Sequence, residues 1–311
     1  MSDQEKSAIL SGIEMGIGTW SWGDRMIWNY GNGYDYEDIH QAFNSAVDFG
    51  FRFFDTAEIY GQGRSESYLG NFMQGSSDQL VIASKFMPYP WRLSSGSLGK
   101  ALRASLKRLK LERISLYQMH QSFPPVKIDT WMGQMAAVVH EGLVQAVGVS
   151  NYDLQQTLQA HNSLIREGLR LASTQMEYSL LNRRIEKTGL LDLCKEQGIT
   201  VIAYSPLAMG MLTGKYTPGH PPSGYRSTKY PSGFLKKIMP LIAEMKRIGL
   251  EHEGKTPAQV ALNWIICKGA IPIPGGKNPR QIEESAGALG WYLTGDEIKT
   301  LDDLSDRILE N

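Results

Sequence analysis

The sequence alternates short apolar runs with longer amphipathic segments along nearly its whole length. Short apolar runs bounded by turn residues are typical of buried strands, whereas apolar residues recurring every three or four positions are typical of helices. Eight strand-helix pairs in a chain of 311 residues predict an α/β fold, a single (β/α)8 TIM barrel domain over residues 1–311. An open doubly wound sheet is the competing arrangement, but the chain lacks the GxGxxG motif expected after its first strand.

We expect strands at 14–20, 51–55, 80–85, 114–120, 144–149, 171–176, 199–203 and 270–273. We expect helices at 35–49, 66–73, 97–109, 129–140, 153–167, 186–197 and 257–267. Two segments break the alternation. Residues 209–234, after the seventh strand, are rich in glycine and proline and predict a long loop over the active-site face. Residues 294–309 form a polar amphipathic tail and predict a further helix.

Composition excludes several classes of function. The chain has 32 basic and 32 acidic residues, a net charge of zero, and no long block of one sign, which argues against a nucleic-acid partner or a membrane-attracted surface. No apolar run is long enough to span a membrane, and residues 1–11 lack the apolar core of a signal peptide. Cys194 and Cys267 have no metal-ligand spacing and lie in helix-like segments, so we expect no metal site, reduced thiols and a cytoplasmic location.

Three of the predicted strands end on a titratable residue: Asp55, Lys85 and His120. The ends of adjacent parallel strands meet at one edge of the sheet, so an acid, a base and an imidazole come together there. Tyr60 follows Asp55 by five residues, in a turn closed by two glycines. Each residue alone also has a structural interpretation: Asp55 as a helix cap, Tyr60 as a packed aromatic, Lys85 as a solvated charge and His120 as a core residue.

The segment Asp55-Thr-Ala-Glu-Ile-Tyr-Gly61, with Lys85 and the His120 strand end, resembles the active-site motifs of the aldo-keto reductases. The likeness runs from about Gly12 to about Leu301. The family reduces carbonyls with NADPH on a (β/α)8 barrel. The resemblance implies that Tyr60 is the general acid, Asp55 the partner of Lys85, and His120 the residue that orients the carbonyl. A free tyrosine titrates near ~10, and we expect the Lys85 cation to lower the pKa of Tyr60.

The resemblance also implies a set of NADPH contacts after the strands. The Ser150-Asn151 pair and Gln175 hold the nicotinamide carboxamide, Tyr204 stacks on its ring, and the glycine-rich turn leading to Lys215 approaches the phosphates. Lys277 and Arg280, at the opening of a helix, suit an adenosine 2′-phosphate. The full set is Gly18, Thr19, Trp20, Asp55, Ser150, Asn151, Gln175, Tyr204, Ser205, Pro206, Leu207, Gly210, Lys215, Gly275, Gly276, Lys277, Arg280, Gln281, Glu284 and Ser285.

Two alternatives stay open for these cofactor residues. Ser150-Asn151 is also a good helix N-cap, and Lys277 with Arg280 also suits a solvated basic turn. The chain departs from the family at Ser285, where asparagine is usual, which puts the adenine contact in question. It departs again at Gln121, where the family often has tryptophan, which makes one wall of the substrate pocket more polar.

The expected partner is a small-molecule carbonyl compound. Trp20, Trp22, Trp28, Tyr89 and Trp91 lie in loops on the expected pocket side, where they either line the pocket or simply pack. The loop at 22–33 and the segment at 287–291 resemble plant, cyanobacterial and pyridoxal reductase-like members, which makes pyridoxal one candidate substrate.

Two other functions are weighed on the same fold. A cofactor-binding regulatory subunit with slow or no turnover is the alternative to a reductase. An isomerase or aldolase is disfavoured, because Lys85 paired with Asp55 is kept protonated and unsuited to a Schiff base. We expect a monomer, the commoner state among relatives with a short tail.

Overall fold

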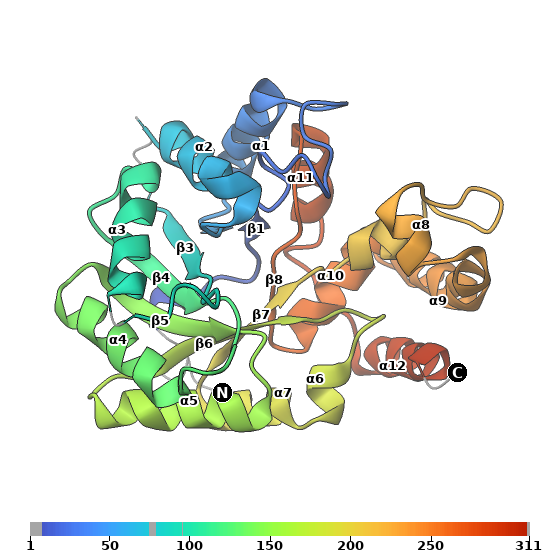
Figure 1. Ribbon diagram of the computed structural model, residues 1–311. Coiled ribbons are helices and arrows are strands. Elements are labelled where there is room, and N and C mark those ends of the chain that lie inside the picture. The colour runs from blue at the N-terminus through green and yellow to red at the C-terminus, as the bar shows by residue number, and fades with distance from the viewer. Residues whose placement is uncertain (1–7, 75–78, 95, 310–311) are drawn as a thin grey trace.

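The computed structural model describes residues 8–74, 79–94 and 96–309 (Figure 1). Its centre is an eight-stranded parallel sheet whose strands pair in chain order from β1 to β8. The ring is closed by backbone hydrogen bonds from Gly16 to Pro272 and from Gly18 to Pro274, each 3.0 Å long. The strands are β1 Ile17–Gly18, β2 Phe53–Asp55, β3 Val81–Phe86, β4 Ile114–Met119, β5 Val144–Ser150, β6 Leu171–Glu177, β7 Thr200–Tyr204 and β8 Ile271–Pro272. The predicted (β/α)8 barrel is confirmed.

Helices surround the strands, as Figure 1 shows. Two helices, α3 and α10, begin and end at the residues predicted from the sequence. The α-helices are α1 Tyr36–Asp48, α2 Arg64–Phe72, α3 Ser97–Leu109, α4 Ile128–His140, α5 Leu154–Arg166, α6 Arg184–Lys187, α7 Leu190–Gln197, α8 Tyr225–Lys229, α9 Ser232–Glu251, α10 Pro257–Cys267, α11 Pro279–Ala286 and α12 Gly295–Leu309. Three short 3-10 helices are η1 Ala8–Leu10, η2 Tyr60–Gly63 and η3 Ala208–Thr213.

The two-residue period of a strand explains where the functional side chains point. Phe53 and Ala83 belong to the small apolar cluster that also contains Leu116, Ala172 and Ile202. Asp55 lies two residues after Phe53, and Lys85 two residues after Ala83, so each shares the face of the apolar residue below it. The acid and the base therefore meet inside the barrel at its carboxyl end, where active sites of this fold lie.

The strands β1 and β8 are shorter than predicted, with two residues each. Their backbones come so close at the seam that a side chain on Gly18 would lie 2.9 Å from the carbonyl oxygen of Ile273. The predicted helix at 186–197 is also divided in two. Gly189 adopts a φ of 76°, which ends α6 and starts α7 at a turn that glycine tolerates.

The prediction for residues 209–234 was wrong in part. The segment does lie over the active-site face, but it contains η3 and α8, and Phe234 is already inside α9. The helix α9, 20 residues long, was not predicted from the sequence. Its buried residues Leu235, Ile238, Leu241, Met245 and Ile248 follow helical spacing, but Pro240 inside the helix and the preceding glycines and prolines obscured it.

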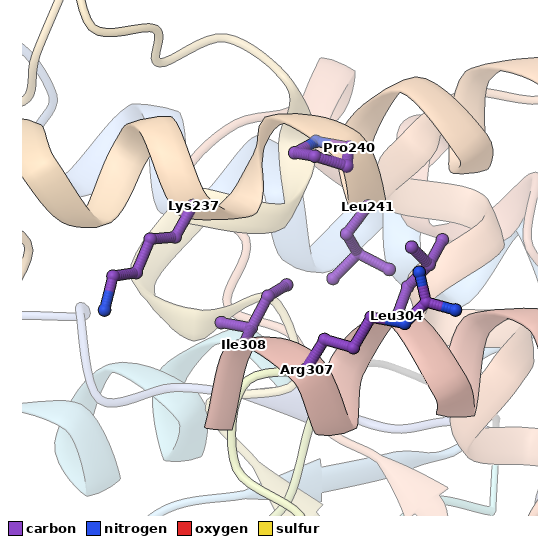
Figure 2. A pocket seen from close by; sticks show the side chains of 6 residues that line it. All are labelled: Lys237, Pro240, Leu241, Leu304, Arg307 and Ile308. Carbon is purple, nitrogen blue, oxygen red and sulfur yellow. The ribbon is translucent and has the colours of Figure 1, made fainter. Parts of the chain in front are cut away.

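The predicted tail helix is confirmed as α12, which packs against α9. The two helices border a groove of about 450 Å3, lined by Lys237, Pro240 and Leu241 of α9 and by Leu304, Arg307 and Ile308 of α12 (Figure 2). None of the α12 residues lines the cavity at the carboxyl end of the barrel. In the described ranges, no helix is both long and apolar enough to cross a membrane.

Candidate active site

The centre of the candidate site is a buried ion pair between Lys85 of β3 and Asp55 of β2. The Lys85 side chain is fully buried and that of Asp55 is 1% exposed. Lys85 Nζ donates to both carboxylate oxygens of Asp55, at 2.5 Å to Oδ2, and at 2.9 Å to the carbonyl oxygen of Thr56. Three acceptors around one nitrogen match the three donors of an ammonium group. The capping interpretation of Asp55 is therefore wrong.

Burial and pairing act against each other at this ion pair. Burial raises the pKa of Asp55, and the Lys85 ammonium opposes that shift. Burial lowers the pKa of Lys85, and the Asp55 carboxylate opposes that shift in turn. Gln175 Nε2 donates to both Asp55 oxygens at 3.0 Å, which further favours the carboxylate. The Lys85 ammonium and the Gln175 amide thus hold the Asp55 carboxylate in a buried site.

Tyr60 is held beside this pair by an unusual turn. Residues Gly61, Gln62 and Gly63 all have positive φ values, of 55°, 60° and 87°. A side chain at Gly61 would lie 2.7 Å from the carbonyl oxygen of Gly23, so glycine is required there. The turn places the Tyr60 hydroxyl 3.4 Å from Lys85 Nζ. The predicted neighbourhood of Asp55, Lys85 and Tyr60 is present in the structure.

The expected lowering of the Tyr60 pKa is wrong for this structure. Burial and the negative charge of Asp55 raise the pKa of Tyr60 well above its ordinary value. Burial is the larger of the two causes, and the Asp55 carboxylate adds to it. Tyr60 therefore holds its proton at neutral pH, the form that a general acid requires.

His120 follows β4 and completes the group. Its ring meets the Tyr60 ring edge to face, with centroids 5.8 Å apart. Burial and the Lys85 cation lower the pKa of His120 to about 3, so the imidazole is neutral at physiological pH. Its Nδ1 is buried and has no hydrogen-bond partner within the described residues. A neutral imidazole offers one N–H donor to a ligand.

A cavity of about 900 Å3 opens beside these residues. Tyr60, His120 and Asp55 line it, whereas Lys85 lies behind them. Among the predicted cofactor residues, the cavity brings together Gly18, Trp20, Asp55, Ser150, Asn151, Gln175, Tyr204, Ser205, Pro206, Leu207, Gly210, Lys215, Gly275, Lys277, Arg280, Gln281, Glu284 and Ser285. Such a volume lies within the usual range for small-ligand and cofactor sites, ~300–1,000 Å3.

Thr19 and Gly276 were predicted as cofactor contacts but do not line this cavity. The hydroxyl of Thr19 is buried and bonds to the carbonyl oxygen of Asp55 at 3.0 Å and to Ser65 Oγ at 2.7 Å. Ser65 also bonds to Thr56 Oγ1 at 2.9 Å. These hydroxyls tie α2 to the ends of β1 and β2, which gives Thr19 a structural position.

The polar residues after β5, β6 and β7 form one connected group. Ser150 Oγ donates to the carbonyl oxygen of Gln175 at 3.0 Å, and Asn151 Nδ2 donates to that of His120 at 3.1 Å. The Tyr204 hydroxyl donates to Asn151 Oδ1 at 2.8 Å. The capping alternative for Ser150-Asn151 is wrong, because Asp153 caps α5.

The turn after β7 has a strained backbone where it faces the cavity. Ser205, Ala208 and Met209 have φ values of 51°, 47° and 56°, in the left-handed region that residues other than glycine rarely adopt. Gly210 continues the series at 95°. The amides of Ala208 and Gly210 bond within the turn, to the carbonyl oxygens of Ser205 and Leu207, at 2.9 Å each. Backbone strain of this kind clusters at active sites and ligand clamps.

Four cationic side chains line the same cavity: Lys215, Arg226, Lys277 and Arg280. Arg226, from α8, was missed, because nothing in the sequence placed a single arginine of the long segment over the site. Lys277 is half-buried, so the interpretation of a fully solvated basic turn is wrong for it. Burial and the charges of Arg226 and Lys215 lower the pKa of Lys277 to about 8.

The helix α11 forms the far wall. Asn278 caps it by accepting from the Gln281 amide at 3.1 Å, and Ser285 Oγ donates within the helix to the carbonyl oxygen of Gln281 at 3.0 Å. Glu284 accepts from Thr256 Oγ1 at 2.5 Å. The hydroxyl of Ser285, the residue that departs from the family pattern, is thus already bonded within its own helix.

The aromatic residues of the loops divide into two groups. Trp20 and Trp28 line the cavity, and Trp20 stacks on Tyr60 with centroids 6.0 Å apart. Trp22 is fully buried and donates to the carbonyl oxygen of Gly276 at 2.8 Å, so of the two alternatives it is packed and does not line the cavity. Trp91 is 77% exposed, stacks on Tyr89 and does not line the cavity.

Known proteins resemble this chain in sequence and architecture. The model of the aldo/keto reductase family matches residues 14–306. A chloroplastic pyridoxal reductase from Arabidopsis thaliana is 42% identical over 94% of this chain and 83% of its own. A solved glycerol dehydrogenase from Gluconobacter oxydans is 25% identical, with a TM-score of 0.81 over 96% of this chain and 93% of its own. A solved aldo-keto reductase from Klebsiella pneumoniae, in complex with NADPH, is 27% identical, with a TM-score of 0.74 over 94% of this chain and 90% of its own. The chain therefore belongs to the aldo/keto reductase family.

Proposed function

We propose that this oxidoreductase reduces an aldehyde or ketone to the alcohol with NADPH, and that Tyr60 delivers the proton. The observation that carries the proposal is the contact of the protonated Tyr60 hydroxyl with the buried Lys85–Asp55 pair, at the edge of a cavity that can hold a cofactor and a small carbonyl. A tyrosine packed only for stability would not need a buried ammonium 3.4 Å from its hydroxyl.

The chemistry of the cavity fits NADPH. Lys215, Arg226, Lys277 and Arg280 outnumber the acids Asp55 and Glu284 on its lining, and Asp55 is already paired with Lys85. Gly210 lines the cavity and has no side chain, so it allows the close backbone approach that phosphates require. Lys277 and Arg280 would hold the 2′-phosphate, and the Ser150–Asn151–Gln175 group the carboxamide. The cofactor supplies the hydride when bound.

The residues at the carboxyl end of the barrel would then protonate and orient the carbonyl of the substrate. Negative charge develops on the carbonyl oxygen during reduction, and Tyr60 gives its proton to that oxygen. The phenolate that remains is stabilised by the Lys85 ammonium, which Asp55 and the carbonyl of Thr56 hold in place. His120 is neutral, so it orients the carbonyl by a hydrogen bond without adding a charge.

The wall around Tyr60 favours a flat substrate with polar substituents. Trp20 is stacked on Tyr60 and is 36% exposed, and Gln121 lines the cavity beside His120. Small aromatic aldehydes fit this combination of an aromatic face and a polar wall. Pyridoxal is the first compound to test, because a relative that is 42% identical carries the name pyridoxal reductase.

The test is NADPH consumption with a panel of aldehydes that includes pyridoxal, for the wild type and for Tyr60→Phe. We expect Tyr60→Phe to lose about 10²–10⁴-fold in kcat, the usual contribution of a positioned acid, while its NADPH affinity stays unchanged. Equal turnover in both proteins refutes the assignment of Tyr60. Tight NADPH binding by the wild type without reduction of any aldehyde supports the regulatory subunit instead.

A further inference from the structure

Two cations, Lys277 and Arg226, lie near the ring of Trp28. Lys277 Nζ lies 4.9 Å from the centre of the Trp28 ring, and the Arg226 guanidinium carbon lies 5.4 Å from it. Lys277 comes from the segment after β8, Arg226 from α8, and Trp28 from the loop between β1 and α1. All three line the cavity. Three segments far apart in the sequence are therefore joined by one aromatic ring.

The Lys277 ammonium is held by one carbonyl oxygen and two aromatic rings. Its Nζ donates to the carbonyl oxygen of Trp28 at 3.2 Å and lies 4.1 Å from the centre of the Tyr34 ring. Tyr34 is itself fixed, because its hydroxyl donates to the carbonyl oxygen of Ser21 at 2.7 Å. An ammonium has three donors, and one carbonyl leaves two for a ligand or water. The cage orients the cation without neutralising it, since aromatic faces carry no net charge.

Arg226 is positioned in the same way. It donates to the Tyr216 hydroxyl oxygen at 2.8 Å, and its guanidinium carbon lies near the centre of the Trp28 ring. Bringing Arg226 and Lys277 toward one ring is electrostatically unfavourable in the free protein. Burial, Arg226 and Lys215 lower the pKa of Lys277, and Asp24 opposes that shift. An anion placed between Arg226 and Lys277 would relieve the repulsion further, and a phosphate dianion is the group with matching charge and acceptor number.

We propose that Trp28, together with Arg226, determines the preference of this chain for a 2′-phosphorylated dinucleotide. The inference rests on the proposed NADPH-dependent function and assigns Trp28 to the phosphate end of the cavity rather than to the substrate. Trp28 positions Lys277 and Arg226, and the three residues close a cage that selects a phosphate over a hydroxyl. Trp20 meets Trp28 edge to face, with centroids 5.6 Å apart, so the cage also supports the aromatic face beside Tyr60.

The experiment measures binding of NADPH and NADH by calorimetry, without turnover, for the wild type, Trp28→Leu, Trp28→Phe and Arg226→Gln. We expect Trp28→Leu and Arg226→Gln each to weaken NADPH binding about tenfold and to leave NADH binding within about twofold. Trp28→Phe keeps an aromatic face and should retain most of the NADPH affinity. Lys299→Gln removes an exposed cation of α12, away from the cavity, and should change neither affinity.

Three results would overturn the inference. In the first, Trp28→Leu weakens NADPH and NADH equally, which means that Trp28 only shapes the cavity. In the second, Trp28→Phe loses as much as Trp28→Leu, which excludes the cation–ring interaction. In the third, NADPH binding is unchanged in every variant. Unchanged NADH binding shows that a variant is folded. Failure of the proposed function is recognised separately, because it appears in the wild type as absent aldehyde reduction or absent dinucleotide binding.

Discussion

The buried Lys85–Asp55 pair makes a strong prediction about stability. Asp55→Asn preserves the shape of the side chain but removes its charge, which leaves the fully buried Lys85 ammonium with neutral acceptors only. Breaking a buried ion pair by removing one partner costs about 3–5 kcal/mol. With an unfolding entropy of about 2 cal/mol/K per residue, a chain of 311 residues would lose roughly 5–8 °C in Tm.

The double variant separates a lost interaction from an unpaired charge. Asp55→Asn combined with Lys85→Met removes both charges of the pair, and methionine fills most of the lysine volume. Replacing both partners of a buried pair is often neutral, so we expect the double variant to melt well above either single variant. Calorimetric scans of the wild type, both single variants and the double variant at pH 7 give the comparison.

One outcome would refute the reasoning about this pair. If the two single losses simply add in the double variant, then Lys85 and Asp55 contribute independently, and the pair is not the coupled unit that the structure shows. All three variants should lose aldehyde reduction, so the melting temperature reports on the pair separately from catalysis.

Three further predictions follow from the same structure. His120 has a folded pKa of about 3 against 6.5 when free, so the unfolded chain binds the extra proton and stability falls as the pH drops between these values; His120→Gln should weaken that dependence in acid unfolding curves. Gly70→Ala would place a methyl 2.4 Å from the Arg108 carbonyl oxygen and should lower the free energy of unfolding by about 1–3 kcal/mol. Gly133→Ala, with open space in α4, should raise it by roughly 0.5–1 kcal/mol, and urea unfolding measures both. Arg183 is 8% exposed and forms ion pairs with three carboxylates. The substitution Arg183→Met should lower the free energy of unfolding by about 3 kcal/mol and should accelerate protease cleavage near α12.

Much of the barrel was predictable because its signals are local. A helix such as α3 shows its apolar period and its ends within its own residues, and a strand such as β3 is a short buried run. Where a local signal was weak, the prediction failed. The helix α9 contains Pro240 and follows a segment rich in glycine and proline, and the break at Gly189 has no periodic signature.

The sequence by itself determined which residues stand at the ends of successive strands. Because side chains alternate along a strand, Asp55 and Lys85 had to share the interior face with Phe53 and Ala83. An acid and a base at adjacent strand ends could therefore be predicted from the sequence alone. The motif around Tyr60 was equally local, since its glycines belong to one turn.

Only the tertiary structure decided the electrostatics of the site and the contacts of Trp28 with Arg226 and Lys277. The pKa of Tyr60 is raised rather than lowered, because burial and the charge of Asp55 outweigh a lysine that is already paired. The contacts of Trp28 with Arg226 and Lys277 join two loops and helix α8, with Trp28 and Lys277 249 positions apart, and no local pattern links them. Such contacts depend on how the closed barrel gathers its loops at one end, which the periodicity of a segment does not encode.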